Sequence, residues 1–225
     1  MTRSIYATND EALIKLIAKV GMVRWSDDPI TFKSGIRSHI YVSGRNELTS
    51  NRTALRAVGS MIAQMAQEAT RHRAGSIHLI GIPTAGTPLA AAGAALSDKE
   101  DPIGCRTMRE VKKGHGANHR WIDGEPNPDE TYMTVDNVIT DGQSKLETIE
   151  RLHEDGYPVD NIYHLILIDR KQGGVEMLRE QGHKVLTRID LPTVVQGLVL
   201  LGFWSKERLR RYQTERAEWM PAPKP

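Results

Sequence analysis

The sequence contains one cysteine, two phenylalanines and no long apolar run, and each shortage excludes a class of protein. A single cysteine, Cys105, cannot form an intramolecular disulfide, and without Cys-x-x-Cys spacing it does not indicate a zinc or redox site. We expect it to be a small buried strand residue. No apolar run approaches the roughly 20 residues that cross a bilayer, and residues 1–20 lack the apolar centre of a signal peptide. We therefore expect a cytoplasmic protein without a membrane segment.

An excess of charge of one sign is also missing. The 225 residues carry 30 basic and 28 acidic side chains, which gives a net charge of +2. This balance, without a basic stripe interleaved with aromatics, argues against a nucleic-acid-binding module. Aromatic residues make up only 5% of a chain that is 39% hydrophobic, so we expect one main core packed by aliphatic side chains.

Apolar segments typical of strands alternate with segments of helical periodicity. The strands are expected at residues 77–82, 103–108, 132–139, 162–168 and 185–189. The helices are expected at residues 53–73, 86–96, 144–154 and 175–181. This alternation predicts an α/β fold with a central, mostly parallel sheet flanked by helices.

The composition also predicts how the chain is divided. We expect an N-terminal helix and irregular hood segment in residues 1–45, the α/β core in residues 46–204, and a terminal helix with a disordered tail in residues 205–225. Residues 112–129 contain several Gly and Pro residues and no apolar period, which is typical of a mobile loop.

One segment, TVDNVITDGQS at residues 134–144, ends a predicted strand with polar residues. Ligands of open α/β sheets bind at the carboxyl ends of strands. Residues 140–144 would form a turn before a helix, whose free N–H groups accept a phosphate, and Gly142 lets the backbone approach it. Asp136 and Asn137 lie just before this turn and can bind sugar hydroxyls. The segment therefore indicates a phosphorylated sugar.

The same residues also have a purely structural interpretation. Ser144 and Glu147 have the spacing of a capping box, so the segment is equally typical of a strand, a turn and a capped helix. The pattern by itself leaves both interpretations open.

The segment also resembles the signature of the type I phosphoribosyltransferases, which bind phosphoribosyl pyrophosphate (PRPP) there. Four further segments are similar to the orotate phosphoribosyltransferases within that family: residues 32–35 with Ser38 and Tyr41, residues 81–90, residues 109–116, and residues 169–172. The resemblance covers residues 32–172 and implies the family fold with a small N-terminal hood. It implies transfer of the phosphoribosyl group from PRPP to orotate, which gives orotidine monophosphate and pyrophosphate in pyrimidine synthesis.

The resemblance also implies roles for individual residues. The catalytic residues would be Arg109, Lys113, His115 and Asp136. PRPP would contact Thr84, Ala85, Gly86, Lys112, Asn137, Thr140, Asp141, Gly142, Gln143 and Ser144, and orotate would contact Lys33, Thr140 and Arg170. It implies Mg²⁺ carried mainly by PRPP, with no metal ligand assigned among the protein side chains. It further implies a homodimer whose catalytic loops serve the neighbouring subunit's site.

Three residues depart from the family pattern. Ala85 stands where the family has Lys, Glu110 follows Arg109 where the family has Lys, and Asn137 replaces the second Asp of a pair. Each change weakens an expected PRPP contact. Two alternatives therefore stay open: a phosphoribosyltransferase for another base, and a regulatory relative that binds PRPP or nucleotide without turnover.

Overall fold

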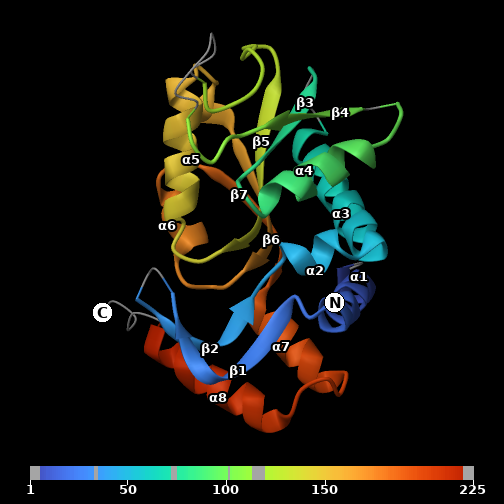
Figure 1. Cartoon of the computed structure of the whole chain (residues 1–225), viewed down its shortest axis with the longest axis vertical. Coiled ribbons are helices and arrows are strands. Elements are labelled where there is room, and N and C mark those ends of the chain that lie inside the picture. The colour runs from blue at the N-terminus through green and yellow to red at the C-terminus, as the bar shows by residue number, and fades with distance from the viewer. Residues whose placement is uncertain (1–5, 33–34, 72–74, 101, 113–119, 220–225) are drawn as a thin grey trace.

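The chain folds around a five-stranded parallel sheet with helices on both faces (Figure 1). The structure is a computed structural model, and it describes residues 6–32, 35–71, 75–100, 102–112 and 120–219. The strands of the sheet are, in spatial order, β4 Ile103–Thr107, β3 Ile77–Gly81, β5 Thr131–Ile139, β6 Tyr163–Asp169 and β7 Lys184–Asp190. The predicted α/β class is confirmed, and all four pairings in this sheet are parallel.

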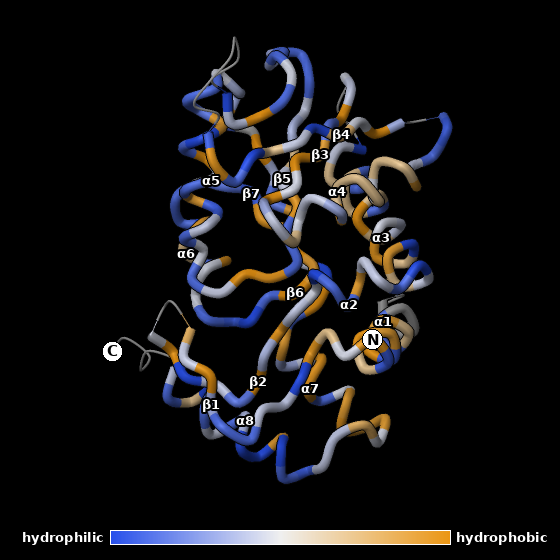
Figure 2. The backbone as a smooth tube through the Cα atoms, viewed as in Figure 1, coloured by the Kyte–Doolittle hydropathy of each residue, from blue (hydrophilic) through white to orange (hydrophobic). Residues whose placement is uncertain are grey.

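Helices cover the sheet on two sides. α3 Arg52–Thr70 and α4 Gly86–Ala95 lie on one face, and α5 Gln143–Glu154 and α6 Gly174–Glu180 lie on the other (Figure 1). The remaining helices are α1 Tyr6–Val20, the short α2 Asn46–Thr49, the 3₁₀ helix η1 Val159–Asn161, α7 Leu191–Leu200 and α8 Lys206–Trp219. Figure 2 shows hydrophobic residues concentrated along β6 and α7 and hydrophilic residues along the outer loops.

Burial on both faces explains why the central strands have nearly continuous apolar sequences. Every residue of β5 except Val138 is buried, and so is every residue of β6 except Tyr163. Gly59 and Gly93 let α3 and α4 approach closely, because a Cβ atom on either would lie 2.9 Å from the facing helix. The sheet and these helices form the main apolar core.

The hood is more regular than the sequence predicts. β1 Val23–Thr31 and β2 Arg37–Val42 form an antiparallel hairpin with an irregular register between Trp25 and Ile30. α8 supports β2, because the Glu215 carboxylate accepts hydrogen bonds from the Ser38 hydroxyl at 3.2 Å and the His39 N–H at 3.3 Å. The predicted boundaries at residues 45 and 204 stay a prediction.

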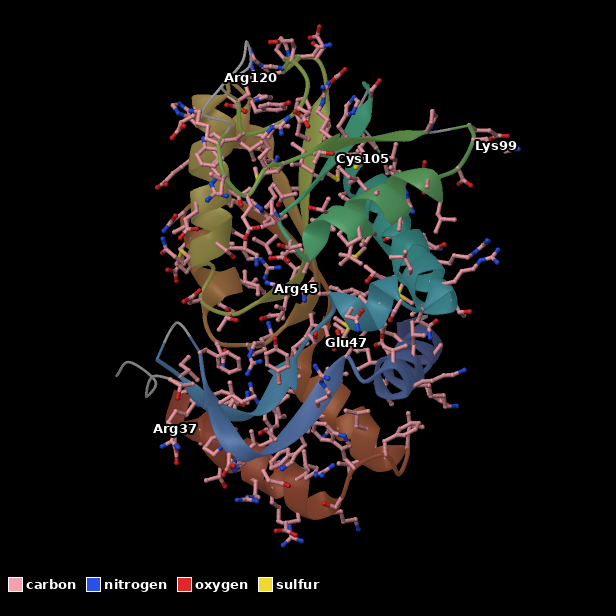
Figure 3. All side chains as sticks on the ribbon, viewed as in Figure 1. Arg37, Arg45, Glu47, Lys99, Cys105 and Arg120 are labelled. Atoms are coloured by element: carbon pink, nitrogen blue, oxygen red, sulfur yellow. The ribbon has the colours of Figure 1, made fainter. Side chains whose placement is uncertain are left out.

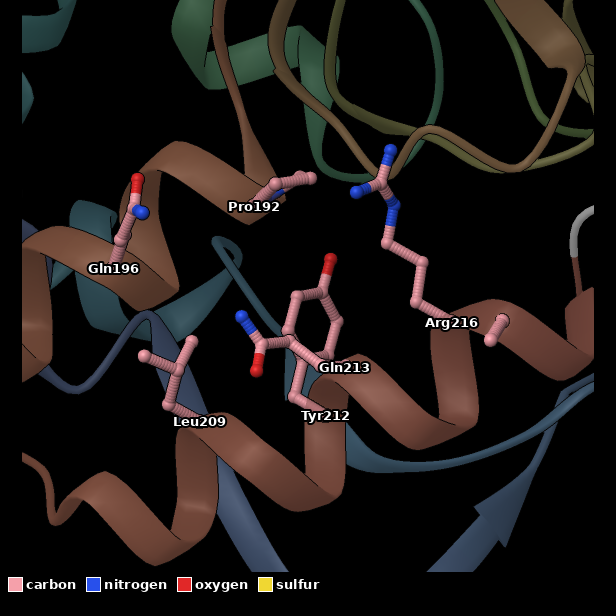
Figure 4. Close-up of a pocket in the computed structure, with 7 residues that line it drawn as sticks. Pro192, Gln196, Leu209, Tyr212, Gln213 and Arg216 are labelled. Carbon is pink, nitrogen blue, oxygen red and sulfur yellow. The ribbon is translucent and has the colours of Figure 1, made fainter.

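α7 is a helix that the sequence pattern does not predict. Its residues LPTVVQGLVL are largely apolar, and Asp190 caps its start by accepting a hydrogen bond from the Thr193 N–H at 2.7 Å. α7 and α8 are separated by a hollow of about 350 Å³, into which the Tyr212 hydroxyl points (Figure 4). Tyr212 is 1% exposed, and its hydroxyl has no hydrogen-bond partner among the described residues.

Three further expectations concern single features. Cys105 is exposed rather than buried, because β4 is an edge strand of the sheet (Figure 3). In the part of the chain that the structure describes, every helix is too short or too polar to span a membrane. The tail predicted to be disordered, residues 220–225, lies outside the described residues.

Acid should destabilise the fold through His164. Burial lowers the pKa of this fully buried imidazole to about 3, with smaller contributions from His183 and Lys145. The unfolded chain therefore binds one more proton below the ordinary pKa of 6.5. The free energy of unfolding keeps its full value with respect to His164 above pH 6.5. Between pH 6.5 and pH 3 it falls by up to about 1.4 kcal/mol per pH unit.

Urea unfolding at about pH 7.5, 6 and 5 measures this loss. His164→Gln should have a smaller pH slope than the native protein, by one proton. His153→Gln, on an exposed part of α5, is the matched control and should keep the native slope. Equal slopes for all three proteins would contradict the assignment.

Tyr212 should stabilise the fold through its ring and not through its hydroxyl. Tyr212→Phe should unfold within about 0.5 kcal/mol of the native protein, because the lost hydroxyl has no partner among the described residues. Tyr212→Ala should lose about 3–5 kcal/mol, as expected for truncating a buried aromatic. Denaturant unfolding checks both values. A loss in the Phe variant as large as that in the Ala variant would show that the hydroxyl forms a stabilising bond.

Candidate functional site

A cavity of about 750 Å³ lies where the carboxyl ends of β3, β5 and β6 meet the hood. The hood contributes Phe32, Tyr41, Val42 and Ser43 to its wall. Arg45, just before α2, also lines the cavity at the junction of hood and sheet (Figure 3). Open α/β sheets bind ligands at this edge, so the cavity is the candidate site.

The cavity brings together predicted residues that are far apart in sequence. Its wall contains Thr84, Ala85, Asp136, Asn137, Thr140, Asp141, Gln143, Ser144 and Arg170. Gly86 and Gly142 stand at the starts of α4 and α5 beside this wall. Lys33, Lys113 and His115 lie outside the described residues.

The turn of residues 140–144 has the backbone geometry of an anion site. Gly142 precedes α5 with a φ of +86°, and a Cβ atom there would lie 2.6 Å from the Met177 methyl group. The Gly174 N–H donates to the Thr140 carbonyl at 3.0 Å, which ties the turn to α6. The Asp141 carboxylate accepts the Gln143 N–H at 3.1 Å. Gln143 and Ser144 line the cavity, so the start of α5 faces it with its positive dipole end.

Lys145 is a residue of this site that the sequence motifs do not reveal. Its side chain is 3% exposed, and its ammonium group forms a 2.5 Å ion pair with the Asp136 carboxylate. The same group donates to the Val138 carbonyl at 2.7 Å and the Ser144 hydroxyl at 3.3 Å. A signal was available, because Lys145, Thr148 and Leu152 have the i, i+3, i+7 spacing of a buried helix face.

Asn137 connects the sheet to the hood. Its side-chain amide donates to the Ser43 carbonyl at 3.3 Å, and its own backbone N–H donates to the Asp136 carboxylate at 2.8 Å. Both Asp136 and Asn137 are less than a tenth exposed. The polar pair at the end of β5 is therefore held from three directions, by Lys145, by the backbone and by the hood.

Arg170, which directly follows β6, also lines the cavity and is 2% exposed. Its Nε donates to the Gln172 side-chain oxygen at 3.1 Å, and Nη1 and Nη2 both donate to the Ile40 carbonyl at 3.3 Å. The guanidinium carbon lies 4.3 Å from the centre of the Phe32 ring. Burial lowers the pKa of Arg170 to about 10, so the group stays cationic at neutral pH. Three of its five N–H donors are used, which leaves two for a ligand.

The loop after β3 approaches the centre of the sheet closely. The Ile82 N–H donates to the Val135 carbonyl at 2.9 Å, and a Cβ atom on Gly86 would overlap that carbonyl oxygen. The Pro83–Thr84 peptide bond is cis. Across the cavity mouth the Thr84 hydroxyl lies 3.5 Å from the Glu110 carboxylate, at the limit of a hydrogen bond.

Two predicted basic residues lie outside the cavity wall. Arg109 forms an ion pair with Asp123. Lys112 pairs with Glu154 at 2.9 Å and lies 5.6 Å from the centre of the Trp121 ring. Hydrogen bonds from the Trp121 N–H and Lys112 lower the pKa of Glu154. In this conformation, neither basic group faces the site.

The charged side chains that line the cavity, among the residues that the structure describes, do not by themselves favour binding of a polyanion. The cations of this wall are Arg45, Arg151 and Arg170, and its acids are Glu110, Asp136, Asp141 and Glu147. Among the described residues no group of three or more His, Cys, Asp or Glu side chains is arranged to hold a metal ion. A phosphorylated ligand would depend on the turn before α5 and on cations from outside this wall.

Comparisons with known proteins agree on one family. No family model matches the sequence. The orotate phosphoribosyltransferase of Aeropyrum pernix is 32% identical over 188 residues, which cover 84% of this chain and 94% of that protein. Its crystal structure superposes with a TM-score of 0.63 at 25% identity, covering 83% of this chain and 98% of that one.

A second solved structure, the UMP synthase of Leishmania donovani, shares the fold. The TM-score is 0.75 at 21% identity, over 93% of this chain and 42% of that one. The sequence identity with the Aeropyrum pernix protein extends over nearly the whole of both chains. This chain therefore belongs to the orotate phosphoribosyltransferase family.

Proposed function

We propose that this protein transfers the phosphoribosyl group from PRPP to orotate, giving orotidine monophosphate and pyrophosphate. The observation that carries the proposal is the turn of residues 140–144, which opens at the start of α5 into the cavity that Arg170 also lines. The turn suits the 5′-phosphate, and the two remaining Arg170 donors suit a planar carboxylate. Family membership supports the same reaction.

In the proposed reaction the bond from the ribose anomeric carbon to pyrophosphate breaks, and pyrophosphate leaves with the electron pair. A ring nitrogen of orotate forms the new bond to that carbon and loses its proton, which the departing pyrophosphate can accept. The protein would hold both substrates in line and stabilise charge, with little covalent participation. Asp136 and Asn137 would lie against the ribose, and residues 82–86 against the pyrophosphate.

Mg²⁺ belongs to this proposal as a partner of the substrate. It takes oxygen ligands and retains several waters, and bound to PRPP it would supply charge neutralisation for the departing pyrophosphate. The described wall fits that arrangement, because Asp136 uses its two oxygens on Lys145 and the Asn137 N–H and does not belong to an acidic cluster. A homodimer with shared sites and a cytoplasmic location are the remaining parts of the proposal.

Arg109, Lys113 and His115 retain their proposed roles at the leaving group. Because Arg109 is paired with Asp123 outside the cavity wall, its role requires the loop to move towards the substrate. Lys112 would have to leave Glu154 and Trp121 in the same movement. Lys33 retains its proposed role at orotate.

A second candidate is a relative that binds PRPP or nucleotide without turnover. Glu110 favours it, because its carboxylate lies at the cavity mouth near the proposed pyrophosphate loop. A fixed anion at this position repels a polyanionic substrate. The two candidates differ in whether product forms.

Incubation of the protein with orotate, PRPP and Mg²⁺, followed by chromatography, distinguishes the candidates. Parallel reactions contain uracil, adenine, guanine or hypoxanthine in place of orotate. We expect orotidine monophosphate and pyrophosphate in equal amounts, only with orotate and only with Mg²⁺. Product from a different base would replace the substrate assignment. No product, in protein that binds PRPP by calorimetry, would favour the regulator.

Reversing the charge at residue 110 should improve PRPP binding. Glu110→Lys should lower the KM for PRPP about tenfold, because a charge-assisted contact to phosphate contributes about 1.5–3 kcal/mol and a repulsion is removed. Glu150→Lys makes the same change on an exposed part of α5 outside the cavity wall and is the matched control. An equal effect in both variants would point to overall charge instead of a local contact.

A further inference from the structure

The Lys145 ammonium group has no donor left for a ligand. A lysine has three N–H donors, and here the acceptors are the Asp136 carboxylate, the Val138 carbonyl and the Ser144 hydroxyl. The group is also buried, with a side chain that is 3% exposed. Lys145 therefore acts on a substrate only through the three groups that it holds.

These three groups belong to different parts of the candidate site. Asp136 lies where the ribose is proposed to bind. Val138 is near the end of β5, just before the turn, and Ser144 is the last residue of the turn. One buried cation therefore fixes the distance between the proposed ribose contact and the proposed phosphate contact.

The ion pair also changes the electrostatics of the cavity. An isolated carboxylate at residue 136 would repel a phosphate dianion at the neighbouring turn, whereas the Asp136–Lys145 pair has no net charge. From β6, the titratable group near Lys145 is His164. Burial lowers its pKa to about 3, so it is neutral near pH 7 and does not replace the cation.

The cavity side offers Asp136 no second cation either. The other charged groups of the described wall, none of which is hydrogen-bonded to Asp136, are Arg45, Glu110, Asp141, Glu147, Arg151 and Arg170. Among the described residues, Lys145 is thus the cation that pairs with this carboxylate.

We propose that Lys145 is a positioning residue for PRPP: it neutralises Asp136 and holds the carboxylate and the phosphate turn as one preformed unit. The inference rests on the proposed function of the cavity. It predicts an effect on PRPP that is much larger than the effect on orotate, since the Arg170 side chain has no contact with Lys145 among its hydrogen bonds.

The first test compares Lys145→Met with Lys99→Met, an exposed lysine far from the cavity (Figure 3). Met keeps most of the buried stem and removes the charge. We expect the KM for PRPP to rise at least about tenfold in Lys145→Met, with the KM for orotate within about twofold of the native value. Lys99→Met should leave both constants unchanged. Equal increases in both constants would overturn the inference.

A pH profile separates this role from a purely structural one. Without Lys145, the buried Asp136 carboxylate has no cation, and burial of an unpaired charge favours its neutral form as the pH falls. The KM for PRPP of Lys145→Met, divided by the native KM at each pH, should therefore decrease on acidification. Asp136→Asn with Lys145→Met should make this ratio independent of pH. A flat ratio in Lys145→Met itself would overturn the inference.

Two outcomes need a separate measurement. If Lys145→Met does not fold, Lys145→Gln, which keeps two N–H donors and removes the charge, is used instead, and an unchanged KM for PRPP would overturn the inference. If the native protein has no transferase activity, the proposed function fails. Calorimetry with PRPP then tests the inference by itself, and equal PRPP affinity in native and Lys145→Met protein would overturn it.

Discussion

The position of β5 at the centre of the sheet is the constraint on which the rest of the site depends. β5 pairs with β3 on one side and β6 on the other, and it is buried along almost its whole length. Because the three strands are parallel, the loop after β3, the turn after β5 and Arg170 after β6 meet at one edge. Segments far apart in the sequence therefore form one cavity without any flexible element having to bring them together.

Polar contacts, and not apolar packing alone, hold the hood over this edge. Arg170 donates to the Ile40 carbonyl within β2, and Asn137 donates to the Ser43 carbonyl just after it. From the outer side, Glu215 of α8 accepts from Ser38. β2 is thus held between the cavity and the terminal helix. Breaking a buried polar contact leaves a donor or acceptor unpaired, which makes the position of the hood specific.

Periodicity and local turn chemistry make the fold predictable from the sequence, whereas side-chain partners do not follow from either. The strands and helices of the sheet lie within three residues of their predicted bounds, and Gly142 marks the turn locally. α7 escapes prediction because its apolar sequence lacks the polar face of a surface helix. In the sequence, Lys145 is an ordinary residue in the first turn of a helix, and its ion pair with Asp136 is seen only in the folded structure. Lys112 likewise belongs to a basic segment, yet the distant Glu154 determines where it points.

The distribution of charge follows from these partners. Ala85 and Glu110 add no cation to the loop side of the cavity, where the Thr84 hydroxyl is close to the Glu110 carboxylate. On the turn side, the ammonium of Lys145 offsets the carboxylate of Asp136. The free N–H groups at the start of α5 add positive potential on this side, and Arg170 adds a buried cation to the wall. Under the proposed function, this turn is the part of the cavity that would hold the 5′-phosphate.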